Sequence, residues 1–74
     1  MFPNLEAEQA RHSHTNTEVA AELGMSRASY EAKKKDGRFS IADANALCDL
    51  YQCSYSYLFS EDLLIPQTWQ TLQN

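Results

Sequence analysis

A glycine-containing turn between two helix-forming segments is the feature that most constrains how this chain can fold. Thr15 and Glu18 have the spacing of a capping box, in which each side chain binds the other residue's backbone amide and so begins a helix. Gly24 is suited to end that helix, because glycine adopts the left-handed conformation without strain. Ser26 can cap another helix only two residues later. The sequence therefore predicts two helices joined by a tight turn over residues 15–34.

The composition favours helices elsewhere too, since the 74 residues include only two glycines and two prolines. Asn4 is predicted to cap a first helix, Ser40 a fourth and Ser54 a short fifth. A chain of this length holds a single small domain. We therefore expect an all-α, five-helix domain over residues 1–59, followed by a C-terminal extension over residues 60–74.

The spacing of apolar residues indicates which helix faces enter the core. Tyr30 is the one large apolar anchor expected in the third helix, which runs from Arg27 towards Lys34 or Lys35. Met25, in the turn before it, is expected to tuck between the two helices. The fourth helix carries an amphipathic stripe at i, i+3, i+6, i+7 and i+10. Its members are Ile41, Ala44, Leu47, Cys48 and Tyr51. These side chains are predicted to face the core.

The charge is divided unevenly along the chain. The net charge is −4, yet all six basic residues lie between Arg11 and Arg38, and five of them fall between Arg27 and Arg38. That window has a net charge of +3, whereas residues 41–74 contain no basic residue. A basic second helix after a tight turn is the layout of a helix-turn-helix unit, whose second helix enters the major groove of DNA. Charge and layout together favour double-stranded DNA as the partner.

Several other classes of function lack support in the sequence. No apolar run exceeds three residues and no signal peptide is visible, so we expect a cytoplasmic protein without a membrane segment. No glycine loop that cradles phosphate and no plausible catalytic triad is present. His12 and His14 form an H-x-H pair, but no further ligand lies near them in the sequence. We expect no enzymatic activity, cofactor, metal or small-molecule substrate.

Four short stretches carry a distinctive combination of residues. They are N-L-x-A-E-x-A-R at residues 4–11, T-x-x-E-V-A-x-x-L-G-M-S-R at 15–27, G-x-F-S-x-x-D at 37–43 and Y-L-F at 57–59. This combination resembles the XRE/Cro-type, lambda-repressor-like DNA-binding domains, in particular those of phages. The resemblance implies a five-helix domain that binds operator DNA, often as a dimer, and regulates transcription. The chain departs from the family pattern at His14, Asn16 and Ala32.

The helix that begins at Arg27 supplies the candidate base contacts. Arg27 can bond guanine O6 and N7 with two parallel hydrogen bonds, although a phosphate contact or a solvated arginine is the alternative. Ala28 can touch a thymine methyl group or simply fill the helix. Ser29 and Glu31 are also candidates for the groove. Glu31 would accept a hydrogen bond from cytosine N4, or would be a solvated acid.

A second group of residues is predicted to contact DNA phosphates. Asn16 and Ser26 lie at helix N-termini, where backbone amides and a polar side chain together bind phosphate. For Ser26, helix capping alone is the alternative. Four basic side chains are predicted to neutralise backbone phosphates: Lys33, Lys34, Lys35 and Arg38. The alternative is that they form a solvated face of the protein.

The C-terminal extension carries more apolar residues than a small helical domain needs. These residues are Leu63, Leu64, Ile65 and Trp69, to which Tyr55 and Phe59 add further apolar surface. Pro66 suits the first turn of a terminal helical stretch. The extension either folds back on the domain or forms a dimer interface, and we expect a homodimer.

The sequence therefore predicts a DNA-binding transcriptional regulator of the phage repressor or Cro type. Two alternatives remain open. One is a protein-interaction module on the same fold, such as an antirepressor or antitoxin-like partner, which does not bind DNA. The other is an excisionase-like architectural factor that bends DNA with little sequence preference.

Overall fold

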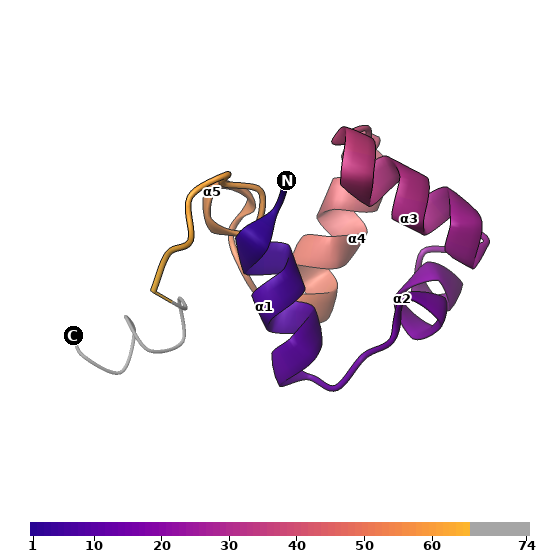
Figure 1. Ribbon diagram of the computed structural model, residues 1–74, viewed down its shortest axis with the longest axis horizontal. Helices are drawn as coiled ribbons and strands as arrows, with labels where there is room; N and C mark the ends of the chain where they lie inside the picture. The colour runs from indigo at the N-terminus through magenta and orange to yellow at the C-terminus, as the bar shows by residue number, and fades with distance from the viewer. Residues whose placement is uncertain (66–74) are drawn as a thin grey trace.

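Five helices form the part of the chain that the computed structural model describes, residues 1–65 (Figure 1). They are α1 (Pro3–Arg11), α2 (Asn16–Glu22), α3 (Arg27–Asp36), α4 (Ile41–Tyr51) and α5 (Tyr55–Leu58). In Figure 1, α1 and α4 occupy the middle of the molecule, with α2 and α3 on one side and α5 on the other. The described residues contain no strand, so the predicted all-α, five-helix fold is confirmed. None of these helices has the length and apolar content needed to cross a bilayer.

Hydroxyl side chains begin α2, α3, α4 and α5, as the sequence predicts. Thr15, Ser26, Ser40 and Ser54 each accept a hydrogen bond from the backbone amide three residues later. The capping box of Thr15 and Glu18 is complete in both directions, with hydrogen bonds of 2.9 and 3.1 Å. These local bonds satisfy amides that the first helical turn leaves unpaired. They also place the start of each helix at a definite residue.

The turn between α2 and α3 is the tight one that the sequence predicts. Gly24 has a left-handed φ of +70°, and the Met25 amide donates to the Ala20 carbonyl over 3.0 Å. Met25 is half-buried and packs against the core, as expected. Tyr30 is fully buried and anchors α3. The helix pair is therefore held by backbone bonds in the turn and by apolar contacts beneath it.

Asn4 does not cap α1, contrary to the prediction. A cap at Asn4 would begin the helix at Leu5, but the helix begins two residues earlier, at Pro3. Proline suits the first helical position because a backbone amide there would have no partner within the helix. Asn4 is instead fully buried in the first turn. Its Nδ2 donates to the main-chain oxygens of Tyr57 and Asp62 over 2.9 and 2.8 Å, and its Oδ1 accepts from the Leu64 amide over 2.8 Å. One side chain thus fastens α5 and the chain beyond it to α1.

The stripe predicted on α4 is correct except at its first residue. Ala44, Leu47 and Tyr51 are buried, and Cys48 is half-buried. Ile41 is 83% exposed. At about 100° per residue, Ile41 points roughly 90° away from the centre of the three buried side chains, so it lies outside their arc. The stripe is therefore narrower than the sequence spacing indicates.

An aromatic cluster closes the end of the molecule where α4 begins. The ring of Phe39 lies 5.9 Å from that of Tyr30, 6.1 Å from Phe2 and 5.8 Å from Phe59. Phe2 and Phe59 meet edge to face at 5.2 Å, the arrangement that aromatic pairs prefer. Phe59 is therefore part of the packing rather than spare apolar surface. Tyr55, by contrast, is 65% exposed.

The described part of the C-terminal extension is held to the domain through its backbone, while its apolar side chains face outward. Asn4 binds main-chain atoms of Asp62 and Leu64. Leu63 is 73% exposed, Leu64 42% and Ile65 55%. Trp69 and the helical stretch predicted from Pro66 lie outside the described residues.

Candidate nucleic-acid interface

The exposed face of α3 is the surface on which the sequence predicts base contacts. Arg27, Glu31 and Lys35 are four residues apart and therefore form one row along the helix. Ala28 and Ala32 lie beside this row and are exposed. Because both carry only a methyl group, another molecule can approach the helix backbone closely between the longer side chains. This face has the shape of a helix that can enter a groove.

Ser26 fixes the N-terminal end of that face. Its Oγ accepts a hydrogen bond from the Ser29 amide over 3.1 Å, so it is a helix cap, one of the two roles considered for it. Arg27 consequently lies at the first position of α3. Ser29 is half-buried and is turned partly away from the face. Contacts of Ser26 or Ser29 with DNA stay predictions.

Arg27 is paired with Glu31 rather than free. Its Nε lies 3.4 Å from the Glu31 Oε2, one helical turn further on. The same Oε2 accepts a hydrogen bond from the Nδ2 of Asn16 over 2.9 Å. The Arg27 side chain is nevertheless 65% exposed. The arginine is therefore attached to the scaffold by one nitrogen while most of its surface faces solvent.

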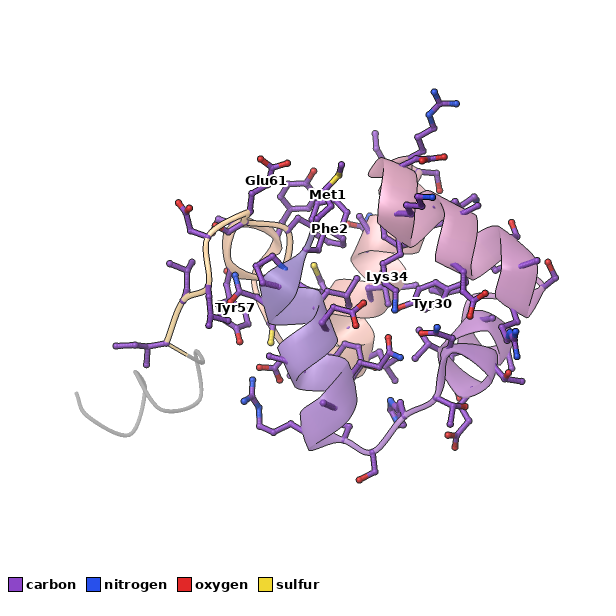
Figure 2. The ribbon with its side chains drawn as sticks, in the orientation of Figure 1. Met1, Phe2, Tyr30, Lys34, Tyr57 and Glu61 are labelled. Carbon is purple, nitrogen blue, oxygen red and sulfur yellow. The ribbon has the colours of Figure 1, made fainter. Side chains whose placement is uncertain are left out.

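Lys34 is an internal residue, which corrects its assignment to an exposed basic face. Its side chain is only 13% exposed, and its Nζ lies 2.6 Å from the Glu6 Oε1 and 2.8 Å from the Asn16 Oδ1. The ammonium also lies 4.9 Å from the centre of the Tyr30 ring. Figure 2 shows Lys34 and Tyr30 pointing from α3 towards α1. This lysine connects three helices, and a phosphate would have to displace Glu6 or Asn16 to reach its ammonium.

Lys33 likewise has a structural partner. Its Nζ donates to the Asp43 Oδ2 over 2.9 Å and so ties α3 to the first turn of α4. This bond from Lys33 holds the pKa of the Asp43 carboxyl below its ordinary value.

Lys35 and Arg38 are different, because both are exposed and their side chains have no hydrogen-bond or ion-pair partner anywhere in residues 1–65. Of the four predicted phosphate-binding cations, these two are free to bind an anion.

The residues that sequence reasoning missed lie in α1. Gln9 is buried, accepts a hydrogen bond from the Tyr30 hydroxyl over 2.8 Å and donates to the Asn16 Oδ1 over 2.8 Å. Burial in this surrounding raises the pKa of the Tyr30 hydroxyl, which therefore stays protonated and donates. The only signal in the sequence was the narrow apolar face of the first helix. A narrow apolar face leaves room for polar side chains to enter the interior.

A second polar group joins α1 to α5. Glu8 is buried, forms an ion pair with Arg11 and accepts a hydrogen bond from the Tyr57 hydroxyl over 2.7 Å. Burial and this hydrogen bond raise the pKa of Tyr57 to about 12. Arg11 is therefore held in an ion pair with Glu8 and is not one of the free cations.

The two histidines have hydrogen-bonding partners within the domain. The Nδ1 of His12 lies 2.9 Å from the main-chain oxygen of Glu8, and the Nδ1 of His14 lies 2.9 Å from the Tyr51 hydroxyl. Across residues 1–65 no group of three or more histidine, cysteine, aspartate or glutamate side chains is arranged to hold a metal ion. His14, one of the departures from the family pattern, thus binds a tyrosine of α4.

Comparison of the chain with protein-family models, curated proteins and solved structures gives no match.

Proposed function

We propose that this protein is a cytoplasmic, sequence-specific DNA-binding regulator of transcription, resembling the phage repressor and Cro-type domains. In this proposal α3 enters the major groove with Arg27 at its leading end. Arg27 reads a guanine, while Lys35 and Arg38 bind phosphates beside the groove. Regulation follows from occupying an operator.

The observation that carries the proposal is the exposed face of α3. Its first turn presents Arg27, its middle is lined by Ala28 and Ala32, and its far end carries Lys35. Arg38 follows directly after the helix, also exposed. Over eight residues from Arg27 to Lys35 the helix rises about 12 Å, a length that fits within the major groove. An arginine that can contact a base, a surface of small side chains and two free cations thus lie on or just after one helix that follows a tight turn.

The proposal includes a homodimer that uses the C-terminal extension. Its support is that Leu63 and Ile65 are more than half exposed although the backbone around them is held by Asn4. A fixed apolar segment loses little conformational freedom when a second copy covers it. Two copies would present two α3 helices to neighbouring half-sites on one face of the duplex.

The experiment is a salt titration of binding to duplex DNA, measured by fluorescence anisotropy on sequences selected from a randomised library. Each phosphate contact contributes about −0.9 to the slope of log affinity against log salt. We expect Lys35→Ala and Arg38→Ala each to reduce that slope on all sequences alike. Lys33→Ala is the matched control, because it removes the same charge from a nitrogen that Asp43 already occupies. It should change the slope less.

The outcomes separate the three hypotheses. A wild-type chain that selects no duplex and whose weak binding is insensitive to salt would refute the regulator and favour the protein-interaction module. Salt-dependent binding with strong bending and no selected sequence would favour the architectural factor. Sedimentation of the free chain and of its DNA complex determines whether one or two copies bind.

A further inference from the structure

Arg27 is the end of a chain of polar contacts that begins in α1: hydrogen bonds reach as far as Glu31, and an ion pair joins Glu31 to Arg27. The Nδ2 of Asn16 donates to the Glu31 Oε2 over 2.9 Å, and that same oxygen lies 3.4 Å from the Arg27 Nε. On its other side, the Asn16 Oδ1 accepts from the Lys34 Nζ over 2.8 Å and from the Gln9 Nε2 over 2.8 Å. These contacts join α1, α2 and α3 into one polar chain. Its last link is the side chain that would meet the DNA.

The partners of Asn16 determine which way its amide faces. Lys34 has only donors, so the oxygen of the Asn16 amide must face it, and the nitrogen must face Glu31. Lys34 is held in turn by Glu6, 2.6 Å away. Asn16 therefore cannot rotate to release Glu31 without giving up its bonds to Lys34 and Gln9. The carboxylate of Glu31 is thus positioned by a second helix and not by α3 alone.

This arrangement leaves one particular edge of Arg27 available. The carboxylate engages Nε, while the two terminal nitrogens have no partner among residues 1–65. A guanidinium reads guanine through two parallel N–H groups in a rigid fork. An ion pair between exposed residues one helical turn apart is by itself too weak to hold a long side chain in one orientation. The bond from Asn16 supplies the restraint that the pair lacks.

We propose that Asn16 and Glu31 are positioning residues: they orient Arg27 so that its terminal nitrogens face a guanine, and so set the sequence preference without touching DNA. This inference rests on the proposed DNA-binding function and changes the roles that the sequence suggests for both residues. Asn16 is then not a phosphate contact, and Glu31 is not an acceptor for cytosine. The guanine preference of Arg27 depends on a bond between α2 and α3.

Two substitutions break the same link with opposite changes in charge. Glu31→Ala removes the acceptor and with it a negative charge near the DNA. Asn16→Asp keeps an oxygen for Lys34 and Gln9 but places a second carboxylate against Glu31. We expect both variants to reduce discrimination at the guanine by about threefold to tenfold, a part of the roughly 5- to 150-fold that a bidentate arginine–guanine contact supplies. Affinity for nonspecific duplex should rise for Glu31→Ala and fall for Asn16→Asp, since only the charge matters there.

Glu31→Gln provides a rescue. It removes the same charge as Glu31→Ala, but its amide oxygen can still accept from the Asn16 Nδ2 and face the Arg27 Nε. We expect it to recover at least half of the lost discrimination on a logarithmic scale. Glu22→Gln is the control, because Glu22 is exposed in α2 and its side chain has no partner within the described chain. That variant should leave discrimination unchanged.

The measurement uses a duplex selected from a randomised library by the wild-type chain, together with versions in which each guanine is replaced in turn. The NMR signal of the Arg27 Nε–H group in the free protein is followed in parallel. We expect a wild-type signal protected from solvent exchange, lost in Glu31→Ala and in Asn16→Asp, and restored in Glu31→Gln. Thermal unfolding of every variant verifies that it is folded.

Each outcome decides a different question. If the wild type selects a duplex with a guanine preference that Glu31→Ala and Asn16→Asp both retain, the positioning role is wrong and DNA binding stands. The role is also wrong if both variants lose specific and nonspecific affinity by one common factor, because that indicates damage to the fold. If the wild type selects no duplex, the proposed function fails, and the inference fails with it.

Discussion

Asn4→Ala should destabilise the domain more than any other single change in α1 that leaves the apolar core intact. The side chain is fully buried and makes three hydrogen bonds to the backbone around α5, to the oxygens of Tyr57 and Asp62 and to the amide of Leu64. Alanine cannot replace any of them. The Asn4 bond to the Tyr57 carbonyl is itself buried, and without it that oxygen would keep only the longer bond from the Ser60 amide, at 3.3 Å.

The magnitude follows from those three bonds. At a net of about 0.5–1.5 kcal/mol each, the loss of the three bonds costs about 2–4 kcal/mol. The better helix propensity of alanine returns only about 0.5 kcal/mol. For a domain of this size the melting temperature falls by about 4–8 °C per kcal/mol, so we expect a decrease of roughly 10–25 °C.

The assay is urea denaturation followed by circular dichroism, with thermal melts in the same buffer. Asn45→Ala is the matched control, because Asn45 is an exposed asparagine of α4 and its side chain has no hydrogen-bond partner in residues 1–65. It should change the stability by no more than about 0.5 kcal/mol. A loss below about 1 kcal/mol for Asn4→Ala would refute the reasoning, since it would mean that the three bonds are not formed in solution.

Two further predictions concern stability. Burial raises the pKa of Tyr51 and of Tyr57 to about 12 and that of the Cys53 thiol to about 11, so the folded state holds these protons more tightly than the unfolded chain does. Stability in urea should therefore begin to fall near pH 9, where the thiols of the unfolded chain ionise, and continue to fall up to about pH 12, whereas an unchanged stability across that window would contradict the burial. Gly24→Ala and Gly37→Ala should each cost about 1–2 kcal/mol, because both glycines have a φ of +70°. A new Cβ at Gly37 would also meet the exposed Met1 side chain, which can move aside, so a much larger loss for Gly37→Ala would show that Met1 is held in place.

Most of the helices could be predicted from the sequence because their starting signals are local. A cap acts on an amide three residues away, so Thr15, Ser26, Ser40 and Ser54 indicate helix starts without knowledge of the fold. The turn at Gly24 is equally local. The same reasoning failed at Asn4, where two roles suit one residue type. Proline beside it begins the helix in its place, and only the position of α5 shows what the asparagine binds.

The candidate site, too, could be predicted from the sequence only in part. The exposed row from Arg27 to Lys35 follows from helix periodicity, and the spacing of Arg27 and Glu31 is visible in the sequence. The assignment of Lys34 to an exposed basic face was wrong, since three consecutive lysines are spread over about 200° around the helix and the middle one faces the other helices. Which lysine that is depends on where Glu6 and Asn16 lie.

The sequence by itself therefore determined where the helices begin, the tight turn between α2 and α3 and the concentration of positive charge in and after α3. Caps, glycine turns and charge are properties of neighbouring residues, which lie close together in any fold. Only the tertiary structure decided which of the charges are free. Hydrogen bonds between different helices, such as those of Asn4 with Leu64 and of Asn16 with Glu31, join residues 60 and 15 positions apart. Whether these hydrogen bonds form depends on how the apolar faces of the helices pack, because that packing sets the distance between polar groups on different helices.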